Sequence, residues 1–430
     1  MAVTSNWCRC TSCHAGYGFR DNNFDFNNDE KIDCLVCHDT TGTYKKFPTD
    51  CGYPPYKEKL FAGKKRFKAV NLKLVAQKVG HSTRESCGKC HFYSGGGDGV
   101  KRGDMDSTLT NPSKDIDVHM DSKGLNFSCT KCHTTFSHDI DGRKYRRPPE
   151  GKRHLALPKD DGHRIRCESC HGTFPHKYSK LNHHTDRVAC VTCHIPAYAR
   201  AMPTNIWWDW SSAGKFTPDH KPIIKKDKFG KPAYHSKKGT MKWGKNLMPA
   251  YEWFNGKMEY TLVTDKKEPQ NGIIYLNRPL GSSEDPDSRI YPFKLHRGKQ
   301  PYDPINKTMI IPKLFGKKGS GAFWAEYDWK KAAQAGMKAA GVPFSGELQF
   351  VETYYYLPLA HMIPPKKDAV ACSECHRSNG SRLAKIKGVY MPRRDRFELL
   401  DKTGWFLTVL SLAVVLIHGF ARILITSKDK

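Results

Sequence analysis

The feature that most constrains this chain is a short motif, Cys-x-x-Cys-His, which occurs seven times. The paired cysteines are Cys10 and Cys13, Cys34 and Cys37, Cys87 and Cys90, Cys129 and Cys132, Cys167 and Cys170, Cys190 and Cys193, and Cys372 and Cys375. The histidines that follow them are His14, His38, His91, His133, His171, His194 and His376. This spacing is the attachment signature of haem c, in which two thiols bind the porphyrin as thioethers and the histidine ligates the iron. We therefore predict seven covalently bound haems c, one at each motif.

Other uses of paired cysteines fit the pattern poorly. A zinc site takes four ligands and does not need a histidine directly after each cysteine pair. A thioredoxin-like redox motif occurs once, close to a βαβ unit. A disulfide framework would not place a histidine after every second cysteine. These classes of site are therefore excluded for the set as a whole.

The composition predicts a fold that is organised by its cofactors. Only 38% of the residues are hydrophobic and the mean hydropathy is -0.66, which is low for 430 residues. Aromatic residues reach 11%, which argues against a disordered chain. Seven porphyrins would supply much of the missing apolar core, so long loops between short helices are expected. We predict a mainly α-helical fold with much irregular loop, packed around haem, plus one C-terminal transmembrane helix.

The motif positions divide the chain into four parts. We predict a six-haem cluster domain over residues 1–196, a cysteine-free, loop-rich wrapping region with a few strands over 197–350, a seventh-haem segment over 351–398 and a transmembrane helix over 404–426. In the wrapping region, an alanine-rich run over 328–340 predicts one helix, because Gly341 and Pro343 follow it.

The apolar C-terminal stretch predicts a membrane anchor. Residues 405–425 include only two ionisable side chains, His418 and Arg422, and are long enough to cross a bilayer core of about 30 Å. Two roles stay open for His418: a hydrogen bond to another helix, or ligation of a b-type haem shared with a partner. Haem c is attached outside the cytoplasm, so we predict a periplasmic haem domain anchored in the cytoplasmic membrane. Residues 1–6 show no export signal, so we expect a misassigned start or a separate upstream segment.

The charge balance favours a small anionic substrate over nucleic acid. The chain has 71 Lys and Arg against 43 Asp and Glu, a formal net charge of +28. Two propionates on each of seven haems would offset about half of this excess. The cations are dispersed along the chain, so we predict no nucleic-acid partner. The remaining positive charge would attract small anions.

The histidine content predicts that most haems have two histidine ligands. Of 20 histidines, seven belong to motifs, which leaves 20 − 7 = 13 others. A second axial histidine makes a haem low-spin and suited to electron transfer, whereas a weak ligand leaves it able to bind substrate. The predicted second ligands are His119, His138, His163, His176, His184 and His361.

Five segments of the sequence resemble a known family. The runs at residues 10–18, 33–48, 95–101, 189–196 and 296–303 are similar to the octahaem tetrathionate reductase family, and the resemblance covers nearly all of residues 1–390. It implies reduction of tetrathionate, nitrite or hydroxylamine at one haem that has a lysine ligand. It further implies that this haem is bound to Cys10 and Cys13, that Lys101 is its ligand, and that Asp98 is a proton or orientation partner. His14 is the other axial candidate for this catalytic haem.

The chain also departs from the family pattern. The family has eight haems and the chain has seven motifs, because the portion that bears the first haem is absent before Met1. The C-terminal helix is an addition, which suggests docking on a membrane cytochrome b that oxidises quinol. Cys8 and Cys51 are either a disulfide or free thiols. A candidate Ca²⁺ site is formed by Asp25, Asn28, Asp29 and Asp33.

The sequence is compatible with three functions. The favoured one is a membrane-anchored reductase that delivers electrons to the haem at Cys10. The first alternative is an electron-transfer conduit without its own substrate. The second alternative is an oxidase of hydroxylamine or sulfur compounds, since a sequence does not fix redox potentials.

Overall fold

A computed structural model describes residues 5–61, 63, 65–136, 138–140 and 165–426 of the chain. The chain forms two compact units, residues 1–369 and residues 370–430. The first six attachment motifs belong to the first unit, and the seventh belongs to the second unit together with the C-terminal helix.

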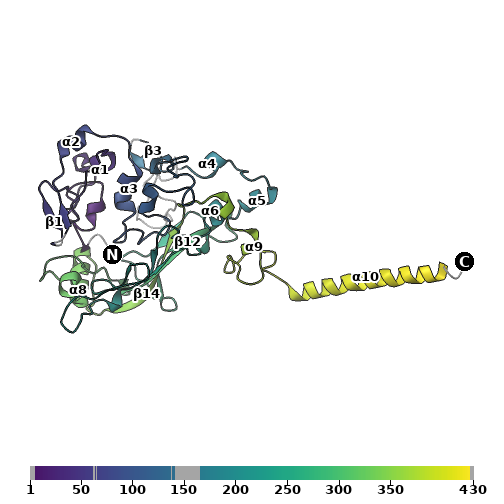
Figure 1. Ribbon diagram of the computed structural model, residues 1–430. Coiled ribbons are helices and arrows are strands. Elements are labelled where there is room, and N and C mark those ends of the chain that lie inside the picture. Colours follow the sequence, from purple (N-terminus) through teal and green to yellow (C-terminus); the bar gives the residue numbers. More distant parts are fainter. Residues whose placement is uncertain (1–4, 62, 64, 137, 141–164, 427–430) are drawn as a thin grey trace. The chain divides into compact units, whose positions relative to one another are not determined.

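The attachment motifs of the first unit lie on short helices and 3-10 turns (Figure 1). The helices are α1 (Leu35–His38), α2 (Leu72–Gln77), α3 (Arg84–His91), α4 (Glu168–His171), α5 (Ser179–His184) and α6 (Cys190–His194). The 3-10 turns are η2 (Thr11–Cys13), η3 (Asp29–Lys31), η4 (Ser107–Thr110) and η5 (Cys129–Lys131). Two small hairpins pair β1 (Lys59–Phe61) with β2 (Lys65–Phe67) and β3 (Thr135–Phe136) with β4 (Asp139–Ile140).

The helical motifs follow from residue spacing. Positions i, i+3 and i+4 of a helix lie on one face, so one turn presents both thiols and the histidine together. Helices α1, α3, α4 and α6 each end on the histidine of a motif. The longest of them, α3, begins with a capping box in which Thr83 and Ser86 bond reciprocally.

A ten-stranded mixed sheet dominates the remainder of the first unit. Its strands are β5 (Thr204–Asp209), β6 (Ile224–Lys226), β7 (Pro232–His235), β8 (Gly239–Gly244), β9 (Ala250–Phe254), β10 (Met258–Tyr260), β11 (Ile273–Pro279), β12 (Arg289–Asp303), β13 (Thr308–Met309) and β14 (Gln349–Pro358). The strand order is β10-β11-β14-β12-β5-β8-β7-β6, with β9 and β13 also paired to β12. Strands β12 and β14 run antiparallel over a long register from Phe293↔Pro358 to Tyr302↔Gln349 (Figure 1).

The prediction of a mainly α-helical fold was therefore wrong. The wrapping region, which is rich in Trp, Tyr, Pro, Gly and Lys, was expected to be mostly loop with a few strands. Its aromatic and β-branched residues favour strands instead, since they pack well on a pleated surface. Tyr291 and Phe293 of β12, Tyr356 of β14 and Phe254 of β9 form one buried cluster with Ile195, which directly follows α6. The sheet thus supplies part of the apolar core that we had expected the porphyrins to provide.

The helix predicted over 328–340 is confirmed as α8 (Trp329–Ala340). The Asp328 side chain accepts a hydrogen bond from the Lys331 amide at the start, and Gly341 ends the helix in the left-handed conformation at φ 66°. A short helix, α7 (Phe323–Glu326), precedes it, and the 3-10 turns η6 (Trp210–Ser212) and η7 (Lys366–Asp368) complete the first unit.

Gly336 is required for the packing of α8. A Cβ atom at this position would lie 2.0 Å from the carbonyl oxygen of Ile311, a backbone atom that cannot swing away. We expect Gly336→Ala to lower the free energy of unfolding by about 1–3 kcal/mol, the usual cost of overpacking. Chemical denaturation of the holoprotein would measure this. The matched control is Gln334→Ala on the exposed face of α8, which should change stability by less than about 0.5 kcal/mol; equal effects of the two variants would contradict the packing argument.

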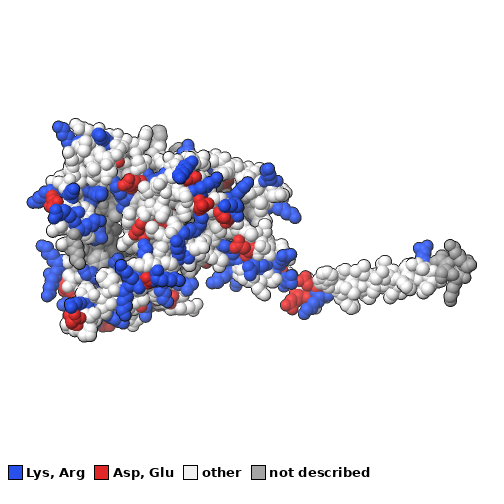
Figure 2. Space-filling model, in the orientation of Figure 1, with Lys and Arg blue, Asp and Glu red and all other residues white. Residues whose placement is uncertain are grey.

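The second unit contains α9 (Cys372–Cys375) and the long helix α10 (Glu398–Thr426). Residues Glu398–Ile425 of α10 are long and apolar enough to cross a membrane, by length and composition. The large apolar side chains of this helix are exposed, among them Trp405, Phe406 and Leu416. Figure 2 shows the helix as mostly uncharged beyond its first turns.

Candidate functional site

Four histidines of attachment motifs each face a second histidine. The ring centroids are 6.0 Å apart for His38 and His138, 6.1 Å for His171 and His119, 6.2 Å for His133 and His361, and 6.2 Å for His194 and His176. The second member lies far away in sequence in three of the pairs and 18 residues away for His176 and His194, so the fold brings the pairs together. All four second members are among the predicted axial ligands.

This spacing fits one metal ion between two imidazoles. A metal–nitrogen bond of about 2 Å and a nitrogen-to-centroid distance of about 1.1 Å, counted on both sides, give about 6.2 Å. Rings in direct contact span about 4.5–7 Å, so the added observation is that one member of each of the four pairs is the histidine of an attachment motif. The residues therefore fit haem iron with two histidine ligands at the second, fourth, fifth and sixth motifs.

Hydrogen bonds at Nδ1 orient several of these imidazoles. His38 Nδ1 lies 2.8 Å from the Gly80 carbonyl oxygen, and His176 Nδ1 lies 3.2 Å from the Asn182 side-chain oxygen. An Nδ1–H that donates to oxygen leaves Nε2 as the free lone pair, which is how metal-bound histidines are commonly held. The local structure thus selects the tautomer that can ligate iron.

Asp104 orients His361 in the same way. Its carboxylate oxygen is 3.0 Å from His361 Nδ1 and also accepts from the backbone amides of Ala360 and His361. Arg102 lies 3.2 Å from the other oxygen. Burial raises the pKa of Asp104, but the Arg102 and His361 charges and these hydrogen bonds outweigh it and hold the pKa well below its usual range. A buried carboxylate therefore stays ionised behind a predicted haem ligand.

Replacing Asp104 should change the redox potential of one haem. An anionic acceptor at Nδ1 makes the imidazole a stronger donor and favours the oxidised metal. We expect Asp104→Asn to raise the potential of the haem held by His133 and His361 by roughly 60 mV, which is a tenfold change in a one-electron equilibrium. Spectroelectrochemical titration would measure it. The control is Asp303→Asn, another buried carboxylate, which bonds to Ser345 and Asn306; a similar shift in both variants would contradict a specific role of Asp104.

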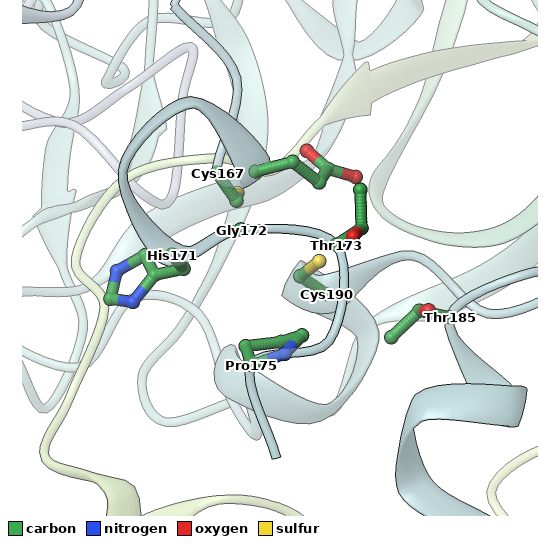
Figure 3. A pocket seen from close by; sticks show the side chains of 8 residues that line it. Cys167, His171, Gly172, Thr173, Pro175, Thr185 and Cys190 are labelled. Carbon is green, nitrogen blue, oxygen red and sulfur yellow. The ribbon is translucent and has the colours of Figure 1, made fainter. Parts of the chain in front are cut away.

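The cysteines of different motifs adjoin one another. The sulfur atoms of Cys13 and Cys90, of Cys87 and Cys129, and of Cys167 and Cys190 are close neighbours. Figure 3 shows the last junction, a small cavity lined by Cys167 and His171 of the fifth motif and by Cys190 of the sixth. Groups attached at adjoining cysteines are close neighbours, so the arrangement suits transfer of electrons from one motif to the next.

The first motif has different surroundings. The His14 ring lies 5.3–5.7 Å from the rings of Phe19, Phe24 and Phe26, at steep angles to each. Its Nδ1 is buried without a hydrogen-bond partner, and burial lowers its pKa. In the part of the chain that the structure describes, no second histidine ring faces His14. This motif therefore lacks the histidine pair that marks four of the other six motifs.

The predicted ligand Lys101 lies in the loop that follows α3. Its Nζ is 5.8 Å from the centre of the Tyr355 ring. The Cys13–Cys90 contact joins α3 to the first motif. Burial lowers the pKa of the His91 ring, and the charges of Arg102, His361 and Lys101 lower it further. Lys101 is thus in the neighbourhood of the third motif.

Asp98 is not directed toward Lys101. One carboxylate oxygen accepts from the Ser107 amide at 2.9 Å, and the other accepts from the Ser107 hydroxyl at 2.5 Å. The structure therefore assigns Asp98 to the anchoring of the loop that carries Lys101, through Ser107 at the start of η4.

Lys294 of β12 supports the same loop. We did not predict a role for this residue from the sequence. Its Nζ is fully buried and donates to the carbonyl oxygens of Val100 and Lys101, at 3.0 and 2.8 Å, and to the Thr204 hydroxyl at 2.5 Å. Burial lowers the pKa of Lys294. The Thr204 hydroxyl uses its own proton on the Gly99 carbonyl at 2.6 Å, so all three acceptors need an N–H from Lys294, and only the ammonium has three. The position of Lys294 between Phe293 and Leu295 was the available sequence signal.

His296 lies two residues further along β12. Its Nδ1 is 3.2 Å from the Asn205 carbonyl oxygen, and burial, followed by the Lys294 charge, lowers its pKa to about 3. His296 pairs across the sheet with Tyr355, over which Lys101 lies. The Asn205 side chain is buried and its amide nitrogen and oxygen have no partner. The face of the sheet under Lys101 is thus polar and basic.

Other predicted residues are placed as follows. His184 Nδ1 is 2.6 Å from the Lys180 carbonyl oxygen. His376 directly follows α9 in the second unit, and His163 lies outside the described residues. Cys8 and Cys51 form a disulfide, which decides between the two states considered for them.

The candidate Ca²⁺ ligands are not gathered around one point. Asp33 is buried and bonds to Lys46 at 3.0 Å and to the Tyr17 and Tyr44 hydroxyls at 2.7 Å. Asp25 is exposed and accepts from the Asn27 amide in its own turn. Among the described residues, no cluster of three or more His, Cys, Asp or Glu side chains could hold a metal ion.

Comparisons with known proteins agree with these geometries. A family model described as "Cytochrome c bacterial" matches residues 205–379. No curated protein matches the chain. The chain is similar to the crystal structure of octaheme cytochrome c from Shewanella oneidensis, with a TM-score of 0.75 and 42% sequence identity over 89% of this chain and 80% of that one. The chain belongs to the same family and is a multihaem c-type cytochrome with covalently bound haem c.

Proposed function

We propose that the chain is a membrane-anchored reductase. In this proposal seven haems c are bound, α10 anchors the protein on the periplasmic face of the cytoplasmic membrane, and a membrane cytochrome b that oxidises quinol donates the electrons. The substrate is a small sulfur or nitrogen species: tetrathionate, nitrite or hydroxylamine. Haem c supplies one-electron redox chemistry when bound.

The observation that carries the proposal is the contrast between the first motif and the four motifs that have a facing histidine. Four motifs have a facing histidine at 6.0–6.2 Å, whereas His14 sits among three phenylalanine rings. A motif without a strong second ligand is the one suited to bind substrate. Lys101, whose side chain is exposed, would hold the haem iron through the lone pair of its amine.

The surrounding cations support an anionic substrate. Arg9 precedes Cys10 directly, and burial followed by the Arg9 charge lowers the pKa of Lys238. Gly96 belongs to the loop that carries Lys101, and a Cβ atom added to Gly96 would lie 3.8 Å from the Lys238 Nζ atom. These two cations come together near the first motif from distant parts of the sequence. Positive charge in a partly enclosed site raises the local concentration of anions.

The second candidate function is a conduit without its own substrate. It is favoured by the thiol contacts that join one motif to the next. Both functions need the four histidine pairs, and they differ only in the first motif.

Turnover separates the two functions. The holoprotein would be assayed with reduced methyl viologen as donor and with tetrathionate, nitrite and hydroxylamine in turn. The reductase predicts turnover of at least one substrate, lowered about a hundredfold or more in Lys101→Ala. The control is Lys114→Ala, at an exposed position. No turnover of any of the three would leave the conduit, and full turnover in Lys101→Ala would remove Lys101 from the catalytic site.

A further inference from the structure

A compact basic segment precedes α10 in the second unit. Residues 383–397, here called the basic knob, fold around Arg394. The Arg394 guanidinium donates to the carbonyl oxygens of Leu383, Ile386 and Val389 at 2.7–2.9 Å and pairs with Asp395 at 2.6 Å. The side chains of Leu383, Ile386 and Met391 are buried. The knob is therefore a shaped element rather than a loose linker.

The knob presents its other cations outward. Lys385, Arg393 and Arg396 are exposed, and so are Tyr390 and Phe397, at 69% and 65%. Between residues 377 and 396 the sequence has seven Lys and Arg and a single Asp, and that Asp is the partner of Arg394. The outward face thus combines several cations with two aromatic rings.

If α10 crosses a membrane, the number of residues between the knob and Trp405 determines how far the knob lies from the hydrocarbon core. The inference therefore rests on the proposed anchoring. Seven helical residues from Glu398 to Trp405 span about 10 Å. The polar headgroup layer is roughly 5–8 Å thick on each side of the hydrocarbon core. With Trp405 at the hydrocarbon boundary, the knob lies at the outer edge of the headgroups, within a Debye length of about 8 Å. The acidic Glu398 at this level is 3.5 Å from Lys402.

We propose that the basic knob binds the anionic headgroups of phospholipids at the extracytoplasmic surface of the membrane. Arginine forks match phosphate oxygens, and aromatic rings favour the membrane interface. Basic residues next to a membrane helix normally accumulate on the cytoplasmic side, so a cluster on the exported side calls for a local role. Binding would hold the haem-bearing chain at a fixed height above the bilayer, where its electron donor lies.

The test measures lipid selectivity around the intact holoprotein. Full-length cytochrome is reconstituted in phosphatidylcholine vesicles that contain trace spin-labelled phosphatidylglycerol or spin-labelled phosphatidylcholine, and the motionally restricted fraction is compared. The test variant is Lys385→Gln with Arg393→Gln and Arg396→Gln. The control removes the same charge far away in sequence, by Lys225→Gln, Lys226→Gln and Lys330→Gln at exposed positions.

We expect the unmodified protein and the control to prefer phosphatidylglycerol over phosphatidylcholine. In the triple knob variant the ratio of the two restricted fractions should fall by about fivefold or more, which corresponds to the loss of about one engaged cation. Equal selectivity in the knob variant and the control, or no preference in the unmodified protein, would overturn the proposal. It would indicate that these cations bind a protein partner instead. Flotation with pure phosphatidylcholine vesicles tests the anchor itself: a protein that fails to float refutes the anchoring, whereas one that floats without lipid preference refutes only the knob.

Discussion

Replacing His176 by Ala is expected to convert one haem from low-spin to high-spin. The His176 and His194 rings are nearly parallel, at 8°, with centroids 6.2 Å apart, and Asn182 fixes the His176 ring through Nδ1. Loss of one imidazole leaves the iron with a weak or exchangeable second ligand. It should also raise the redox potential of this haem by on the order of 0.1 V, because axial ligands set haem potentials over about 0.8 V.

Low-temperature electron paramagnetic resonance of the oxidised protein would measure the conversion. Added imidazole should restore the low-spin signal, since it refills the vacated position. The matched control is His220→Ala at an exposed position in the sheet region, which should leave every signal unchanged. If His176→Ala keeps all low-spin signals without added imidazole, the pairing of His176 with His194 on one iron is wrong.

Replacing Lys294 by Met is expected to disturb Lys101 without touching it. Lys294 donates to the carbonyl oxygens of Val100 and Lys101 and to the Thr204 hydroxyl. Methionine has a similar length and no donor, so the Lys101 backbone loses its support and three acceptors lose a partner. A displacement of about 1 Å at a reacting group can cost about a hundredfold in rate. We therefore expect a broadened or lost Lys101-dependent resonance signal and a similar loss of turnover.

Two controls separate positioning from general damage. Lys299→Gln alters the same strand at a position paired with Glu352 and should leave the signal unchanged. Thr204→Val removes one acceptor of Lys294 and should give a weaker form of the same defect. If Lys294→Met leaves the Lys101-dependent signal intact, Lys294 does not position Lys101; if Lys101→Ala also leaves it intact, the ligand role of Lys101 itself is wrong.

The attachment chemistry could be predicted from the sequence because it is local. A thiol pair and a histidine within five residues need only one helical turn to come together, which the structure provides in α1, α4 and α6. Helix α8 was predictable for the same reason, since its capping residues Asp328 and Gly341 adjoin it.

The sheet could not be predicted in the same way because its strands are stabilised by distant partners. Strand β5 pairs in parallel with β12, about ninety residues later, and β14 inserts between β11 and β12. Gly, Pro and Lys in these segments resemble loop composition until the pairing is known. The roles of Asp104 and Lys294 could not be predicted for a related reason. Each contacts a residue that is distant in sequence and that only the fold brings close.

The central claim is that one haem of this cytochrome, bound at Cys10 and Cys13, differs from its histidine-paired neighbours. The most direct test is low-temperature electron paramagnetic resonance of the oxidised holoprotein, with a pyridine haemochrome count on the same sample. The account predicts seven haems, and one signal that shifts on addition of nitrite or hydroxylamine and changes in Lys101→Ala. A spectrum of low-spin signals alone, unaffected by either ligand and by Lys101→Ala, would contradict it and leave an electron conduit.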